Sequence, residues 1–220
     1  MTSTKTDLTA YDIILLDLDG LLVNTEELHF EAYLSMLKNR GCKRDFTFNE
    51  FAAIAHTSSH GLREWLSPFV PGVEWSTLYQ EKQTAYLDLL EKGAITLLPG
   101  VADFLLMTRE KKRAVATNSN ATQVSLIRKH VPALNSIKTW VTREQYEEPK
   151  PAPDAYLTAY LKIAAPQDRA IGFEDSLRGI QALQKAGFDA ILICDPNHPQ
   201  MKESISVPHY TSFAAFMKMN

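Results

Sequence analysis

The sequence has few of the features that mark membrane or extracellular proteins. Only two cysteines, Cys42 and Cys194, occur in 220 residues, and they lie far apart with no metal-type spacing. No apolar run approaches the roughly 18 residues that a membrane span needs. The first residues also lack the apolar core of a secretion signal. We therefore expect reduced, packed thiols in a cytoplasmic protein that does not bind a membrane.

The charge balance and the missing glycine-rich patterns argue against further classes of function. The net charge of −3 gives no basic excess that could attract nucleic acid or an anionic membrane surface. The patterns G-x-x-x-x-G-K-[ST] and G-x-G-x-x-G do not occur. We therefore expect neither ATP nor NAD as a cofactor, and no nucleic acid as a partner.

What the sequence does contain, from about residue 95 onward, is an alternation of short apolar runs with helical patterns. The apolar runs predict strands at residues 113–117, 137–141, 170–173 and 190–194. Between them, the periodicity predicts helices at residues 101–112, 122–130, 153–163 and 177–186. Strands that alternate with helices form βαβ units, so we expect an α/β fold with a parallel sheet covered on both faces.

Residues 25–93 interrupt this alternation. Helices are predicted at residues 26–40 and 76–92, each followed by a glycine, and no strand is evident between them. A helical block placed directly after the first strand suggests an inserted lid. We expect a catalytic core made of residues 1–24 and 95–220, and a helical cap made of residues 25–94, with hinges at 21–25 and 95–100.

Two aspartates end the first apolar run. Asp17 and Asp19 follow Ile-Ile-Leu-Leu at spacing i, i+2, and on an extended chain such residues point to the same side. Two like charges about 4 Å apart repel by roughly 1 kcal/mol in water and by about 4 kcal/mol at an effective dielectric constant near 20. The pair therefore predicts a cation nearby.

Polar residues also follow the other predicted strands. Residues 117–120 (Thr-Asn-Ser-Asn) end the second strand, Glu174 and Asp175 end the fourth, and Lys150 lies in a proline-rich loop after the third. In open parallel sheets, ligands bind beyond the carboxyl ends of the strands. We therefore expect these groups to meet in one site.

The combined groups fit phosphoryl transfer. Asp17 can attack phosphorus and form an aspartyl-phosphate, while Asp19 can act as general acid and base. Thr117 and the amides after it can hold phosphate oxygens at a helix N-terminus. Lys150 can pair with the nucleophile and with the phosphate.

Magnesium is the cation that this set of donors favours. The carboxylates of Asp17, Glu174 and Asp175, with a main-chain oxygen near Asp19, are hard oxygen ligands of the kind that Mg²⁺ prefers. The ion would relieve the repulsion between the carboxylates and neutralise phosphate charge.

These residues resemble the motifs of the haloacid dehalogenase superfamily. The family's motifs correspond in order to Asp17-Leu-Asp19-Gly20, to Thr117, to Lys150-Pro-Ala-Pro and to the acidic pair Glu174-Asp175. The resemblance spans residues 13–187. It implies a Rossmann-like core with a helical cap, a nucleophilic Asp17, an acid/base Asp19 and bound magnesium.

The segment Asn24-Thr25-Glu26, with His29 and the helical insertion, looks most like the β-phosphoglucomutase-like branch. That likeness implies a substrate-side role for His29 and a specificity loop at residues 55–63. The predicted substrate-binding residues of the cap and core are Gly20, His29, Ser59, His60, Lys82, Asn118 and Ser119. The mutase pattern has an arginine in the specificity loop, and the nearest one here, Arg63, falls in the following helix.

We therefore expect a magnesium-dependent phosphatase, acting as a monomer on a small, sugar-phosphate-like monoester. A phosphomutase is the alternative, because it uses the same Asp19 but returns the phosphoryl group to a bound sugar. A dehalogenase is less favoured, since it lacks the second aspartate and needs no magnesium. A ligand-binding regulator that has lost catalysis is also less favoured, because every expected catalytic group is present.

Overall fold

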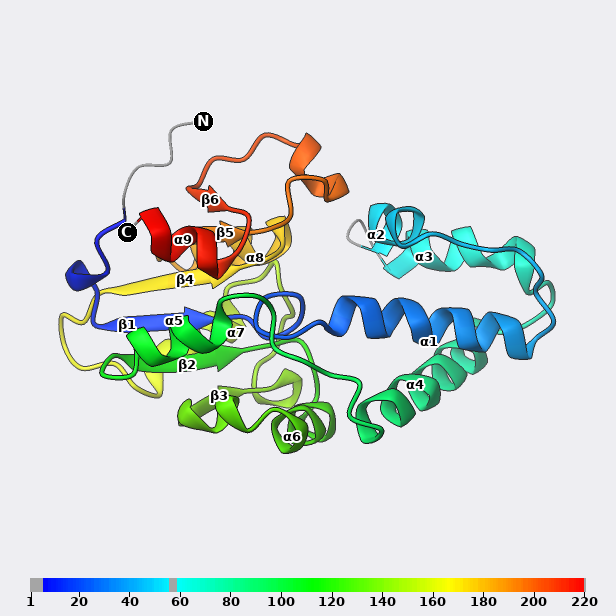
Figure 1. Ribbon diagram of the computed structural model, residues 1–220, viewed down its shortest axis with the longest axis horizontal. Coiled ribbons are helices and arrows are strands. Elements are labelled where there is room, and N and C mark those ends of the chain that lie inside the picture. The colour runs from blue at the N-terminus through cyan, green and yellow to red at the C-terminus, as the bar shows by residue number, and fades with distance from the viewer. Residues whose placement is uncertain (1–5, 56–58, 220) are drawn as a thin grey trace.

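The structure is a computed structural model that describes residues 6–55 and 59–219. The described strands form one parallel sheet in the order β3-β2-β1-β4-β5-β6 (Figure 1). The strands are β1 (Ile13–Leu16), β2 (Lys112–Ala116), β3 (Thr139–Val141), β4 (Ala170–Glu174), β5 (Asp189–Ile193) and β6 (His209–Tyr210). This arrangement confirms the α/β fold class. The strand β6 was not predicted, because two residues are too short to show a periodicity.

Helices cover both faces of the sheet because alternate residues of the central strand point to opposite sides. Ile14 and Leu16 pack with α5 (Val101–Met107), α6 (Ala121–His130) and α9 (Phe213–Met219). Ile13 and Leu15 pack with α7 (Asp154–Leu161) and α8 (Leu177–Lys185). Figure 1 looks onto the face that α5 and α9 cover. All of β1 is buried, so the strand fixes the position of Asp17, which follows its last residue.

The helix predicted at residues 101–112 is shorter in the structure. It ends at Met107, where the buried hydroxyl of Thr108 donates to the carbonyl of Phe104 at 2.8 Å. The chain then turns, and β2 already begins at Lys112. The polar residues 108–111 continue the apparent helical pattern in the sequence, but in the structure they form this turn.

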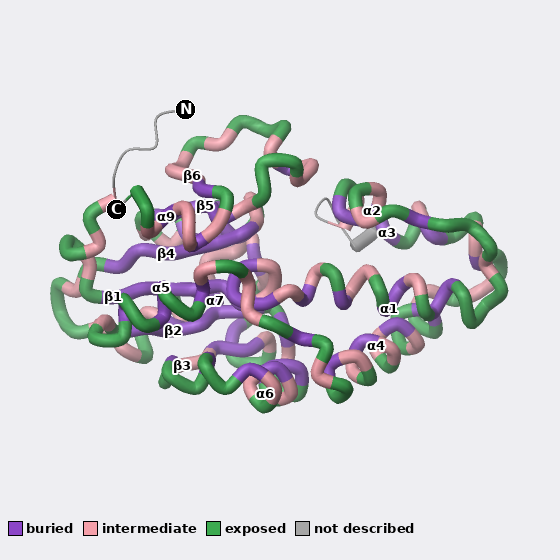
Figure 2. Tube along the Cα trace, in the orientation of Figure 1, coloured by how far each residue is buried: buried purple, intermediate pink, exposed green. Residues whose placement is uncertain are grey.

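The cap helices are α1 (Thr25–Asn39), α2 (Phe48–Ala55), α3 (Ser59–Leu66) and α4 (Trp75–Glu91). They lie together beyond the carboxyl ends of the strands (Figure 1). They have an apolar core of their own, which includes Tyr33, Phe51 and Leu66. Figure 2 shows this as a second region of buried chain beside the sheet. The predicted helices 26–40 and 76–92 correspond to α1 and α4.

The two hinge segments contact each other. The side-chain oxygen of Asn24 accepts from the amide of Thr96 at 2.7 Å, and the amide of Asn24 donates to the carbonyl of Thr96 at 3.2 Å. Asn24 is the residue before α1, but its side chain joins the hinges instead of capping that helix. The boundaries at residues 24–25 and 94–95 stay predictions, and this crossing point is consistent with them.

Short 3-10 helices complete the described chain: η1 (Leu8–Ala10), η2 (Ser67–Phe69), η3 (Pro132–Ser136), η4 (Arg143–Gln145) and η5 (Pro199–Lys202). Of the helices in the described residues, none combines the length and apolar character that crossing a membrane requires.

Candidate active site

The site is centred on Asp17, at the carboxyl end of β1. Its amide continues the sheet by donating to the carbonyl of Phe173 at 3.1 Å, which fixes the backbone at this point. The carboxylate is buried and forms an ion pair with the ammonium of Lys150. Lys150 also donates to Glu174 Oε1 at 2.7 Å and to the hydroxyl of Tyr156 at 2.9 Å. The ends of β1 and β4 and the loop that carries Lys150 therefore lie together, as the sequence predicts.

Both carboxylate oxygens of Glu174 are hydrogen-bonded within the protein. Oε1 accepts from Lys150 and, at 2.6 Å, from Tyr156, while Oε2 accepts from the hydroxyl of Ser176 at 3.0 Å. A Cβ at Gly179 would lie 1.8 Å from this carboxylate, so only glycine fits there. These contacts hold Glu174 in one orientation beside Asp17.

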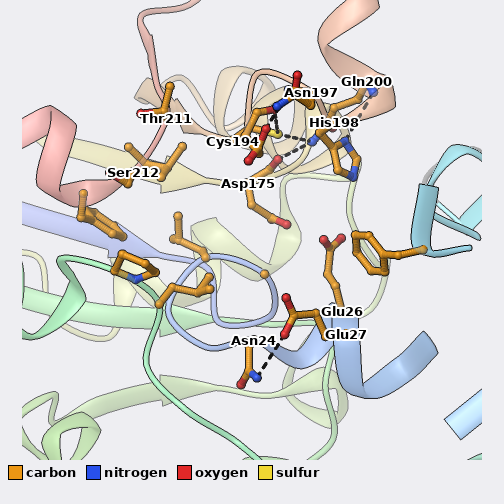
Figure 3. Close-up of a pocket in the computed structure, with 18 of the residues that line it drawn as sticks. Asn24, Glu26, Glu27, Asp175, Cys194, Asn197, His198, Gln200, Thr211 and Ser212 are labelled. Carbon is orange, nitrogen blue, oxygen red and sulfur yellow. Dashed lines mark hydrogen bonds between the residues drawn. The ribbon is translucent and has the colours of Figure 1, made fainter. Parts of the chain in front are cut away.

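Asp175 faces the turn that follows Asp19. A Cβ on Gly20 would lie 2.2 Å from Asp175 Oδ2, and the φ of +75° at Gly20 also favours glycine. The main chain of Asp175 is held by Gln200, whose side-chain nitrogen donates to the Asp175 carbonyl at 2.6 Å. In Figure 3 the side chain of Asp175 points into a cavity, toward Glu26.

Asp17, Glu174 and Asp175 each place one carboxylate oxygen within 4.8 Å of the others. Such a buried set of oxygens fits a hard divalent cation such as Mg²⁺. The Asp19 carboxylate is not part of this group. A main-chain oxygen near Asp19, as the sequence suggests, remains compatible with the arrangement.

The electrostatics of the group also favour a cation. Burial raises the pKa of Asp17 to about 8, and the charges of Glu174 and Asp19 add to this effect, although Lys150 opposes it. Burial, followed by the charges of Glu26 and Glu174, raises the pKa of Asp175 well above its usual range. Lys150 supplies one positive charge, which does not balance three carboxylates. A divalent ion would remove this mismatch.

Asp19 is oriented by two hydroxyl groups from the end of β2. Its Oδ2 accepts from Thr117 Oγ1 at 2.7 Å and from Ser119 Oγ at 2.8 Å. Its Oδ1 is buried and has no hydrogen-bond partner in the described part of the chain. The geometry thus leaves one oxygen of Asp19 for a bound molecule. The side chain of Asn118 is exposed and accepts from the hydroxyl of Tyr146 at 2.7 Å.

On the cap side, Lys82 and His29 form a pair at 2.8 Å between Lys82 Nζ and His29 Nδ1. Lys82 is buried, not solvated, and burial lowers its pKa to about 7 while the charge of Asp19 acts in the opposite direction. Burial, and then the charge of Lys82, keeps the pKa of His29 well below its usual range. The imidazole is therefore neutral and can accept from the ammonium.

The other predicted cap residues are less informative. The backbone of Ser59 and His60 belongs to α3, but their side chains lie outside the described residues, as do residues 56–58. Arg63 lies in α3, as expected from the sequence, and is exposed.

A cavity of about 410 Å³ adjoins Asp175 (Figure 3). It lies between the Gly20 turn, the start of α1, the start of α2 and the loops after β5 and β6. Its charged lining is acidic, with Glu26, Glu27 and Asp195 beside Asp175.

Ser176 follows the acidic pair at the end of the fourth predicted strand, but the sequence assigns it no role of its own. Sequence reasoning missed Tyr156 and Gln200. Both reach the site from helices, and no spacing in the sequence signals their direction.

The parallel sheet carries an aspartate pair at the end of β1, and a lysine and further acidic groups lie around this pair. Together these features define a class of hydrolase. The sequence model for "Haloacid dehalogenase-like hydrolase" matches residues 14–193, so the chain belongs to this family. This confirms both the resemblance that the motifs indicated and the prediction of a hydrolytic enzyme.

Known proteins match over most of the chain. Protein CbbY of Cereibacter sphaeroides is 28% identical over 193 residues, which are 82% of this chain and 83% of that protein. A probable pseudouridine-5′-phosphatase of Drosophila melanogaster is 28% identical over 208 residues, covering 91% of this chain and 89% of the relative. The crystal structure of CbbY from Rhodobacter sphaeroides in complex with phosphate aligns with a TM-score of 0.74 at 25% identity, covering 93% of this chain and 95% of that one.

Proposed function

We propose that the protein is a magnesium-dependent phosphatase of small phosphate monoesters, which acts through an aspartyl-phosphate on Asp17. One observation carries the proposal: Asp17 lies in a buried group of carboxylates beside Lys150, while Asp19 keeps one buried oxygen that has no hydrogen-bond partner among the described residues. The position of Asp17 suits a nucleophile next to a cation. The oxygen of Asp19 suits an acid/base group that contacts the substrate when it binds. The family membership and the phosphatase name of a relative support the same reaction.

Asp17 attacks the phosphorus, and the ester oxygen leaves with a proton from Asp19. Thr117 and Ser119 hold Asp19 through Oδ2, so that Oδ1 faces the leaving oxygen. Water then attacks the phosphorus, Asp19 takes its proton, and the bond to Asp17 breaks to release phosphate. Lys150 stays charged throughout, since Asp17 and Glu174 raise its pKa in spite of its burial.

Asp17, Asp175 and an oxygen near Asp19 are the groups that we propose for Mg²⁺, with Glu174 beside them. When bound, the ion supplies positive charge that stabilises the phosphoryl group as its charge redistributes. Both oxygens of Glu174 are already hydrogen-bonded, so its main contribution is to hold Lys150 and to add negative charge to the ion site.

A phosphatase is favoured over a phosphomutase. A mutase must hold the second phosphate of its bisphosphate intermediate, and the arginine nearest to the specificity loop, Arg63, is exposed on α3. The acidic lining of the cavity beside Asp175 also disfavours a second phosphate there. A dehalogenase is disfavoured by Asp19, because its proton-transfer role has no place in that reaction. The cytoplasmic location and the monomer stay predictions.

The test is a screen of phosphorylated metabolites, sugar phosphates included, in the presence of Mg²⁺. A phosphatase releases inorganic phosphate in amounts equal to the alcohol formed. A mutase would interconvert hexose phosphates without releasing equivalent phosphate. Release of no phosphate from any monoester in the screen would contradict the proposal.

A further inference from the structure

Three buried side-chain oxygens have no hydrogen-bond partner in the described residues. One of them is Thr25 Oγ1, at the start of α1. The other two are Asp19 Oδ1 and the hydroxyl oxygen of Tyr86 in α4. The side chain of Tyr86 is completely buried. Buried polar atoms are nearly always hydrogen-bonded, because leaving one unpaired lowers stability. A phenylalanine would fill the same space without this cost, so the hydroxyl requires another explanation.

The packing of α4 directs Tyr86 toward the site. Leu78, Lys82, Tyr86 and Leu90 recur every four residues as the buried stripe of this helix. The ring of Tyr86 stacks on His29 with the centroids 4.1 Å apart, and Lys82 Nζ lies 5.0 Å from the same centroid. The helix is also anchored on the core, where Gln123 of α6 donates to Gln83 at 3.4 Å. The proposed substrate-side residues and Tyr86 therefore form one surface of the cap.

The negative charge of Asp19 acts on Lys82, and it adds to the burial that raises the pKa of Tyr86. The phenol consequently remains protonated and is available as a donor. Asp19 Oδ1 is thus an acceptor, and Tyr86 Oη a donor, without a hydrogen-bond partner in the described residues, and the charge of Asp19 acts on Tyr86.

We propose that Tyr86 is a catalytic residue of the phosphatase proposed above: its hydroxyl donates a hydrogen bond to the oxygen that exchanges a proton with Asp19 Oδ1. In the first step this is the ester oxygen, which leaves as its bond to phosphorus breaks and receives the proton of Asp19. In the second step it is the oxygen of the attacking water, which gives its proton back to Asp19. Tyr86 keeps its own proton in both steps and stabilises the negative charge on the oxygen.

The test compares Tyr86→Phe with a matched variant, Tyr33→Phe. The ring of Tyr33 also packs against Lys82, with Nζ 5.2 Å from its centroid, but Asp19 is not among the charges that affect its hydroxyl. Both variants lose one buried phenolic hydroxyl and keep the ring. We expect Tyr86→Phe to lower kcat/KM for an alkyl phosphate about tenfold or more, because the hydrogen bond is made to a developing charge. Tyr33→Phe should remain within twofold of the wild type.

The leaving group separates catalysis from packing. With p-nitrophenyl phosphate, whose leaving phenolate needs little stabilisation, we expect Tyr86→Phe to lose much less kcat/KM than with the alkyl phosphate. The melting temperature of Tyr86→Phe should equal or exceed that of the wild type, since an unpaired hydroxyl is removed.

An alkyl phosphate kcat/KM within twofold of the wild type would overturn the assignment of Tyr86 while the phosphatase proposal stands. An equal loss with both substrates, together with a lower melting temperature, would show a packing role and would also overturn it. Absence of hydrolysis by the wild-type protein would instead refute the proposed function, and the role of Tyr86 would fall with it.

Discussion

Lys150 Nζ lies 2.7 Å from Glu174 Oε1 and also pairs with Asp17, so one ammonium joins the ends of β1 and β4. All three side chains are almost completely buried. Removing one partner of a buried ion pair leaves uncompensated charge and costs about 3–5 kcal/mol. We expect Lys150→Met to lower the free energy of unfolding by about this amount, and to lower kcat at least a hundredfold.

Urea denaturation and phosphate release would check this prediction. Lys162→Met is the control, because Lys162 is exposed and its ammonium contacts Gln145 at 2.9 Å, away from the site. Mg²⁺ should recover part of the lost stability by neutralising the same carboxylates. A variant at position 150 that is as stable and active as the control would contradict the role given to this lysine.

Asp17→Asn should abolish turnover and leave the fold intact. The amide is nearly isosteric with the carboxylate but cannot act as the nucleophile. Lys150 loses its ion pair with Asp17 but keeps the one with Glu174 at 2.7 Å, so in the absence of metal we expect a smaller loss of stability than in Lys150→Met. Circular dichroism would monitor the fold, and phosphate release the activity. Magnesium-dependent hydrolysis that persists in this variant would be incompatible with an aspartyl-phosphate on Asp17.

The convergence of Asp17, Thr117 and Asp175 could be predicted from sequence for a geometric reason. Each follows a buried strand, and the ends of parallel strands meet at one edge of the sheet. This inference needs only the positions of the strands, and apolar runs in the sequence predict those positions. The direction of a side chain at a strand end then follows from the pleat.

Residues on helices could not be placed in this way. Lys82 lies on an amphipathic helix, and a polar position in such a pattern fits solvent or an active site equally well. In the structure it is buried against His29, because α4 packs along α1 and over the core. Tyr156 and Tyr86 read as packing residues in the sequence, since a tyrosine ring satisfies an apolar pattern wherever its hydroxyl points. Only tertiary structure shows the positions of these hydroxyls.

Removal of magnesium should stop the reaction reversibly. We expect EDTA to abolish phosphate release and added Mg²⁺ to restore it. An ion at a hundred times its dissociation constant stabilises the folded state by about 2.7 kcal/mol, which is roughly 5–10 °C in melting temperature for a chain of this size. Asp175→Asn should lose most of this shift. Phosphate release that is indifferent to the chelator would contradict the role proposed for Mg²⁺.

The lowered pKa of Lys82 predicts a pH dependence of stability. Its pKa is about 7 in the folded protein and 10.5 as the reference value, so between these values the unfolded chain holds more protons. The free energy of unfolding therefore rises with pH in this window. Below pH 7 the folded protein carries the buried ammonium and is destabilised by its full burial cost. Compared with Lys82→Met, we expect the wild type to gain about 2–3 kcal/mol between pH 7 and 9.5.

Urea denaturation of both proteins at the two pH values would measure this difference. His29 stays neutral across the window, because burial keeps its pKa low. Groups that titrate elsewhere contribute equally to both proteins and cancel. Parallel stability profiles for the wild type and Lys82→Met would show that the ammonium is not buried as described.

Gly20→Ala tests how closely the turn after Asp19 must approach Asp175. The new Cβ would lie 2.2 Å from Asp175 Oδ2, so this carboxylate must move away from Asp17. We expect at least a tenfold weaker affinity for Mg²⁺ by calorimetry and a similar loss of kcat/KM. Gly72→Ala is a matched control, because Gly72 has the same φ of +75° but nothing within 4 Å of its Cβ position. Both variants carry the same backbone strain, of order 1 kcal/mol. Gly20→Ala should lose more stability than Gly72→Ala because of its clash with Asp175, and only Gly20→Ala should lose metal affinity. Equal metal affinities in the two variants would mean that Asp175 does not bind the ion from its present position.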